Sequence, residues 1–127
     1  MKKILKILVI SFLLFSNASA EERNNKLEKL FTQLKNTKDL PTAQIVEKKI
    51  WEIWSIHPSD DRRGFRLTEL LTQGSRLMNV GELGKAYKLF TQIIAVEPDW
   101  SEAWNKRATV LYMMGNYEQS QNDINEV

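Results

Sequence analysis

Apolar residues recur every three or four positions in the second half of the chain, which is the spacing of one face of an α-helix. They form two stripes: Leu70, Leu77 and Met78, then Leu83, Tyr87, Phe90 and Ile94. Gly81 lies between the stripes, where a residue with a left-handed backbone can end one helix and lead into the next. The pattern predicts a helical hairpin.

The same pattern returns 34 residues later. At this offset the chain pairs residues of similar size and polarity: Leu70 with Trp104, Gly74 with Ala108, Leu77 with Leu111, Gly81 with Gly115, Ala86 with Ser120 and Phe90 with Ile124. Pro98 closes the first unit, and residues 99–102 ("DWSE") have the sequence of a capping box that would open the second. Two helical hairpins in tandem are therefore expected.

This period and these positions resemble the tetratricopeptide repeat (TPR), whose pattern holds a Trp, a small residue at the close helix crossing, a Gly turn, a small and a large residue, and a Pro. Residues 67–100 match a complete unit with Leu70 at the Trp position. Residues 101–127 match a unit that stops at the twenty-seventh of 34 positions, with Ser120 in place of the usual Ala. The resemblance implies an all-α fold in which antiparallel helical hairpins stack as a short right-handed TPR solenoid.

A looser match lies upstream, at an offset of 40 residues. It places Leu30, Leu34, Val46, Ile50, Ile53 and Pro58 against positions of the first unit. Two interpretations stay open for residues 21–66, which we expect to form a divergent N-terminal helical hairpin and a linker. The segment is either a repeat with extra residues around "PSDDRRG" or an unrelated helical pair that acts as a cap. Asp60 in this linker is a candidate helix cap.

The first twenty residues have the three-part layout of a secretory signal peptide. Three lysines are followed by an apolar run at residues 7–15 and by a small-x-small ending at Ala18 and Ala20. The run is shorter than the roughly 20 residues of a membrane-spanning helix. We therefore expect cleavage after Ala20, no stable membrane anchor afterwards, and a periplasmic or secreted bacterial protein.

Removal of this leader changes the charge. The chain has 18 basic and 16 acidic residues, and the leader holds three of the basic ones and none of the acidic ones, which leaves 15 against 16 and a net charge of −1. A near-neutral domain gives no support for nucleic-acid binding, which needs a basic patch. There is no Cys, so stability has to come from packing even in an oxidising compartment.

Candidate chemistry is sparse. His57 is the single histidine, and without Cys or a carboxylate cluster it does not make a zinc site, which needs three or four ligands. No nucleophile motif and no Gly-rich phosphate loop is present. We expect neither an enzyme nor a metal site nor a cofactor.

The resemblance implies a concave groove, lined by the first helix of each unit, that binds a protein or peptide. The lining positions are Thr68, Leu71, Ser75, Met78 and Asn79, then Glu102, Asn105, Thr109, Tyr112 and Met113. This lining lacks the Lys and Asn pairing with which relatives clamp a terminal carboxylate, and a polar, Met-rich surface suits an uncharged or amphipathic segment. Alternatively, Met78 and Met113 pack against neighbouring hairpins.

The four tryptophans add one more candidate. We assign Trp104 to the hairpin core and Trp54 to a buried face, whereas Trp51 lies off that stripe and is a candidate aromatic anchor for a partner. The sequence thus favours an exported protein-interaction module. Two alternatives stay open: an envelope scaffold that associates with itself or with a larger complex through its open C-terminal end, and a truncated fragment without activity of its own.

Overall fold

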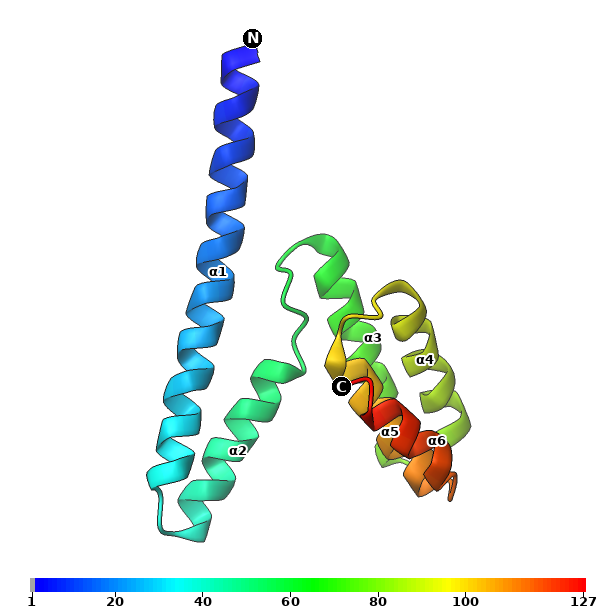
Figure 1. Ribbon diagram of the computed structural model, residues 1–127. Helices are drawn as coiled ribbons and strands as arrows, with labels where there is room; N and C mark the ends of the chain where they lie inside the picture. Colours follow the sequence, from blue (N-terminus) through cyan, green and yellow to red (C-terminus); the bar gives the residue numbers. More distant parts are fainter. Residues whose placement is uncertain (1) are drawn as a thin grey trace. The chain divides into compact units, whose positions relative to one another are not determined.

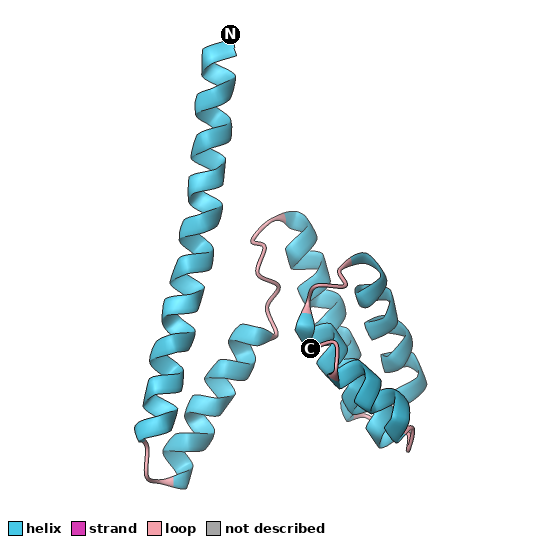
Figure 2. Ribbon diagram, viewed as in Figure 1, coloured by secondary structure: helices cyan, strands magenta, loops and turns pink. Residues whose placement is uncertain are grey.

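The computed structural model describes residues 19–127 in full and, of residues 2–18, only the helical backbone. The predicted leader therefore lies outside the described residues except for its last two. Helices joined by loops make up the described chain, and no strand occurs in that part (Figures 1 and 2). The helices are α1 (Lys2–Asn36), α2 (Leu40–Trp54), α3 (Arg62–Asn79), α4 (Leu83–Val96), α5 (Ser101–Met113) and α6 (Tyr117–Ile124). The expected all-α fold is confirmed, with consecutive helices packed in pairs.

The N-terminal unit is an antiparallel pair formed by α1 and α2. Val46 and Ile50 on α2 are its buried residues, in agreement with the apolar stripe in the sequence. The Phe31 ring packs on Trp54 with 5.8 Å between ring centroids, and Arg23 Nη2 donates a hydrogen bond of 3.1 Å to the Ile53 carbonyl. These contacts hold the two helices together at the C-terminal half of α2.

The start of α2 is fixed by a side-chain cap. Asp39 Oδ1 accepts the backbone N–H of Thr42 at 2.9 Å, which satisfies one of the amides that the first turn of a helix leaves unpaired. A hydrogen bond with the Thr42 side chain, together with this backbone hydrogen bond, lowers the pKa of Asp39. Residues 55–61 then lead from α2 to α3.

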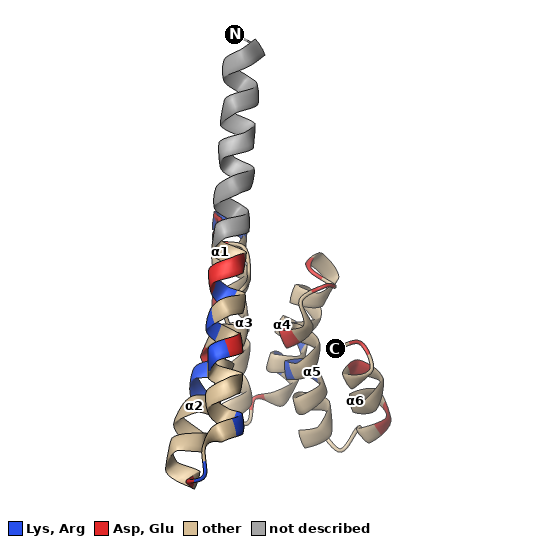
Figure 3. Cartoon of the chain, turned by 60° about the vertical axis from the view of Figure 1, so that its left-hand side comes forward, with Lys and Arg blue, Asp and Glu red and all other residues tan. Residues whose placement is uncertain are grey.

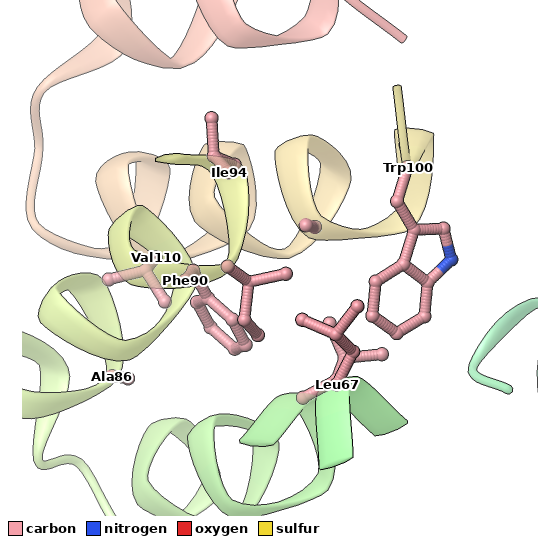
Figure 4. Packing of buried hydrophobic residues seen from close by; sticks show 9 residues of the cluster. Leu67, Ala86, Phe90, Ile94, Trp100 and Val110 are labelled. Carbon is pink, nitrogen blue, oxygen red and sulfur yellow. The ribbon is translucent and has the colours of Figure 1, made fainter. Parts of the chain in front are cut away.

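The second unit comprises α3 to α6, in which each helix contacts the next one in the chain. Its core is a cluster of buried side chains from α3, α4 and the start and end of α5, shown in Figure 4. The members are Leu67, Leu71, Ala86, Phe90, Ile93, Ile94, Trp100, Ala103 and Val110. Phe90, Ala86 and Ile93 are 0% exposed, so the centre of the core lies on α4.

The tightest point of this unit is the crossing of α3 and α4. A Cβ atom added to Gly74 would stand 2.5 Å from Cε1 of Phe90, closer than real Cβ contacts come. Gly74 is therefore required where the sequence pattern places the small residue of the crossing. At the equivalent crossing of α5 and α6, Ser120 is buried and its hydroxyl donates a 2.8 Å hydrogen bond to the Ala108 carbonyl.

Both predicted glycine turns are confirmed, and they are copies of each other. Gly81 and Gly115 have φ values of 81° and 80°, the left-handed region in which other residues are strained. After each glycine the next N–H returns to the carbonyl five positions earlier, Glu82 to Leu77 and Asn116 to Leu111, both at 2.9 Å. This is the hydrogen bond of a Schellman motif, and it ends α3 and α5 in the same way.

The two helix starts that we predicted from capping residues are displaced by one position. α3 begins at Arg62, so Asp61 rather than Asp60 is the cap, and its Oδ1 accepts the Gly64 N–H at 2.7 Å. α5 begins at Ser101, which puts Trp100 at the cap position, and no side chain caps that helix. The expected capping box is therefore wrong, because the helix starts one residue later than the motif requires.

The tryptophans of the second unit also differ from expectation. Trp100 is the buried one, 5% exposed, with its ring edge-on to His57 at 5.0 Å. Trp104 is only half-buried; it packs on the margin of the core, and its Nε1 donates a 2.8 Å hydrogen bond to the Pro98 carbonyl. Trp104 therefore closes the edge of the hairpin and does not fill its centre.

Replacement of Gly74 tests the close crossing. Gly74→Ala should lower the free energy of unfolding by about 1–3 kcal/mol, because the new methyl group overlaps the Phe90 ring and the packed core leaves that ring no space to move. Urea unfolding followed by circular dichroism measures the change.

Gly84→Ala is the matched control. Gly84 lies in α4 with nothing within 4 Å of an added Cβ, so this change should leave stability unaltered or raise it by up to about 1 kcal/mol through helix propensity. Equal effects of the two substitutions would contradict the crossing at Gly74.

Candidate functional site

The predicted lining residues of α3 divide into core and surface. Leu71 is 1% exposed and belongs to the core cluster, so its assignment to the groove is wrong: α5 packs over that side of α3. Met78 is half-buried and packs against the same cluster. Asn79 is exposed at the end of α3, and its side chain has no hydrogen-bond partner among the described residues.

The hydroxyl groups of α3 are engaged within the protein. Thr68 Oγ1 donates to the Gly64 carbonyl at 3.0 Å and accepts the His57 N–H at 2.9 Å. Ser75 Oγ donates to the Leu71 carbonyl at 2.8 Å. Because each hydroxyl has a single proton, neither Thr68 nor Ser75 keeps a donor for a partner.

On α5, Glu102 departs most from the prediction. Its side chain is 6% exposed, with Oε1 3.4 Å from Lys106 Nζ and Oε2 3.4 Å from Asn105 Nδ2. The carboxylate is thus neutralised within the helix and is not presented to a partner. Thr109 is exposed, and its hydroxyl donates to the Asn105 carbonyl at 2.9 Å.

The C-terminal end of α5 carries an exposed aromatic and methionine patch. Tyr112 and Met113, both predicted lining residues, are 64% and 51% exposed. Tyr117 at the start of α6 places its ring centroid 5.1 Å from that of Tyr112, and Met114 is exposed in the turn between them. The sequence analysis missed Tyr117 and Met114, although their position beside the Gly115 turn could have indicated them. We call these four residues the Tyr112 patch.

A buried ion pair holds the helices that carry this patch. Arg107 on α5 binds Asp123 on α6 through two hydrogen bonds, Nε to Oδ2 at 2.7 Å and Nη2 to Oδ1 at 2.8 Å. Its Nη1 also reaches Thr91 Oγ1 of α4 at 3.3 Å. The guanidinium lies over the rings of Trp104 and Tyr87, at 5.0 and 5.7 Å from their centroids. The hydrogen bonds to Asp123 raise the pKa of Arg107, so the guanidinium stays charged.

Trp51, the candidate anchor of the N-terminal unit, is 44% exposed. Its ring meets Trp54 edge to face at 5.1 Å, which fixes its orientation on α2. A role for Trp51 in binding stays a prediction.

His57 takes part in local packing. Besides the contact with Trp100, its Nε2 lies 3.7 Å from Glu97 Oε2, and Glu97 also pairs with Arg63 at 2.8 Å. Within residues 19–127, no group of three His, Cys, Asp or Glu side chains is close enough to hold a metal ion. In the same part of the chain, no helix has an apolar stretch long enough to span a membrane.

Paired helices with a 34-residue period and matching glycine turns define a helical-repeat protein. The chain is 30% identical over 117 residues to a TPR repeat-containing protein of Rhizobium etli, and the match covers 87% of this chain and 55% of that protein. The chain is thus a homologue of a TPR repeat-containing protein, which confirms the resemblance, and it spans about half the length of that relative. No family model matches the chain, and no solved structure matches it.

Asp123→Ala tests the ion pair between α5 and α6. The change leaves the Arg107 charge largely buried without its partner, so the free energy of unfolding should fall by about 2–3 kcal/mol. Denaturant unfolding of the purified protein measures the loss.

Lys48→Met serves as the control, because it removes the exposed pair of Lys48 with Glu52, whose side chains are 79% and 62% exposed. That change should cost less than about 0.5 kcal/mol. If Asp123→Ala lowered the free energy of unfolding no more than Lys48→Met does, the Arg107 pair would contribute no more than a surface pair.

Proposed function

We propose that this protein is a protein-interaction module that holds a peptide segment of a partner against the surface formed by α3 and α5. The observation that carries the proposal is the Tyr112 patch, in which two tyrosines and two methionines are more than half exposed. Exposed apolar patches of this kind mark interaction sites, and the TPR homologue points to the same class of function.

The other predicted lining residues favour an uncharged or amphipathic segment. Asn79 keeps an unpaired amide, and the half-buried Asn105 keeps part of its hydrogen-bonding capacity, so both suit the backbone of a bound peptide. Tyr112 and Met113 would cover its apolar side chains. Among the predicted lining residues the single carboxylate, Glu102, is buried against Lys106, so this lining offers no free charge to a charged ligand.

We further propose that the protein works outside the cytoplasm and is not an enzyme. The support for export is the leader-like sequence of residues 1–20. The support for a non-catalytic role is the relationship to a TPR protein. In helical-repeat proteins each repeat packs on its neighbours, and the stacked repeats form an extended binding surface.

Self-association is a second candidate function. Ile124 on α6 and Val127 after it are 44% and 58% exposed, and Tyr117 lies on the same helix. A second copy could cover these residues, and sedimentation over a range of protein concentrations would detect such an assembly.

The groove is tested with the double substitution Asn79→Ala and Tyr112→Ala, which removes one amide and one aromatic ring from exposed positions. A partner is captured from cell extract, identified by mass spectrometry and purified, and its affinity is measured by calorimetry. We expect the affinity to fall at least about tenfold, the effect of losing one aromatic contact in an interface.

The matched control is Phe65→Ala with Gln92→Ala, which removes one aromatic ring and one amide from exposed positions outside the predicted lining. It should leave the affinity unchanged. If the control weakens binding and the groove variant does not, the partner binds elsewhere.

Export is tested by the mass of the mature protein. Cleavage between Ala20 and Glu21 should give a species that begins at Glu21 in the periplasmic fraction of a bacterial host. Intact-mass spectrometry of that fraction decides the point: a dominant species that still carries residues 1–20 would contradict export by this route.

A further inference from the structure

A second surface lies on α3, separate from the predicted peptide groove. It is a hollow of about 1030 Å³ lined by residues of α3 and by the end of α4, and none of the predicted groove residues takes part in it. Its lining consists of Arg62, Arg63, Arg66, Leu67, Glu69, Leu70, Gln73, Arg76 and Val96. We call it the arginine groove. Four guanidinium groups and one carboxylate make it strongly cationic.

Three of these arginines are not neutralised by the protein. Arg63 pairs with Glu97 at 2.8 Å and donates to the Val96 carbonyl at 2.7 Å. By contrast, the side chains of Arg62, Arg66 and Arg76 have no hydrogen-bond or ion-pair partner within the described residues. The sequence analysis did not single out this charge, because the leader and the acidic residues elsewhere bring the whole chain close to neutrality.

The three unpaired arginines follow one line along the helix. Arg62, Arg66 and Arg76 are separated by four and ten residues, close to one and three turns, so they lie on one side of α3. At 1.5 Å per residue the line is about 21 Å long. An extended peptide of about six or seven residues spans this length.

The lining between Arg66 and Arg76 is mixed: Leu70 is half-buried, whereas Glu69 and Gln73 are exposed. Val96 at the end of α4 is 57% exposed and lies at the Arg63 end of the groove, where its carbonyl accepts the hydrogen bond from Arg63. A ligand that fills the groove therefore meets arginines at both ends, and Leu70 beside polar side chains at the middle. Arginine is the residue that binds carboxylates through two parallel hydrogen bonds, and it is weakly hydrated, so it gives up water at small cost.

We propose that the arginine groove binds an acidic segment of a partner protein, about six or seven residues long, with carboxylates at both ends and uncharged side chains between them. A hollow whose middle holds Leu70 beside the amide of Gln73 fits a segment of polypeptide better than a flat membrane surface, which would not reach into it. This surface is additional to the groove proposed above and does not depend on it.

The probe is a fluorescently labelled seven-residue peptide with two glutamates at each end and three leucines between them, titrated with the full chain and followed by anisotropy. We expect saturable binding that weakens as salt rises, because exposed ion pairs are screened. The same peptide with glutamine in place of every glutamate should not bind. Absence of binding by the acidic peptide, or equal binding by both peptides, would overturn the proposal.

Substitutions then place the peptide on the groove. Arg66→Gln with Arg76→Gln should weaken binding about tenfold, since two charge-assisted contacts are lost. Lys85→Gln with Lys88→Gln makes the same change of net charge on α4, outside the groove, and should leave the affinity within about twofold. If both variants lost the same affinity, the effect would come from net charge alone, and the assignment of the peptide to the arginine groove would be wrong.

Three further experiments test other possible ligands of the arginine groove. Inorganic phosphate that displaces the peptide at concentrations near the protein's own would show a small-anion site. Binding of vesicles with anionic lipids that is lost in Arg66→Gln with Arg76→Gln would show a membrane surface. α6 carries acidic and no basic residues, so a second copy is the third competitor (Figure 3). Self-association that is lost in the same variant would show that a second copy binds the groove. Each of these three outcomes would overturn the proposal of an acidic peptide.

Discussion

The approach of α3 to α4 at Gly74 sets the geometry on which the rest of the second unit depends. The Phe90 ring occupies the space of the missing Cβ, and with Ala86 and Ile93 it forms the fully buried centre of the core. α5 packs into the same cluster through Ala103 and Val110. This packing fixes the orientation of α5 and so the direction in which its exposed side chains point. The position of the Tyr112 patch therefore depends on the crossing of α3 and α4.

Features that depend on a few neighbouring residues were predicted well from the sequence. Gly81 and Gly115 end their helices in the left-handed conformation because no other residue adopts it without strain, and the 34-residue period places both. Gly74 at the crossing follows from the same period. The cap of α3 was missed by one residue, Asp61 for Asp60, because either aspartate has the chemistry and only the first helical turn decides between them.

Features that depend on which neighbouring helix packs on a given face were not predictable from the sequence. Leu71 and Glu102 share the spacing of the predicted lining, yet both are buried, because helical periodicity gives a face and not the neighbour that packs on it. The pair of Arg107 with Asp123 joins residues 16 positions apart, and most such charges in a sequence are solvated. Trp100 was missed as a core residue for the same reason.

α6 buries few side chains against the rest of the protein, and this affects how a partner binds. This eight-residue helix buries only Ser120 and Asp123, both polar, whereas α4 buries four residues at the centre of the core. A helix that buries few apolar side chains opens at lower free energy than one that forms the centre of a core. Tyr117 belongs to α6, so the Tyr112 patch is complete only while α6 is folded. A partner that contacts both tyrosines therefore binds the folded state selectively, and its affinity includes the free energy needed to hold α6 folded against α5.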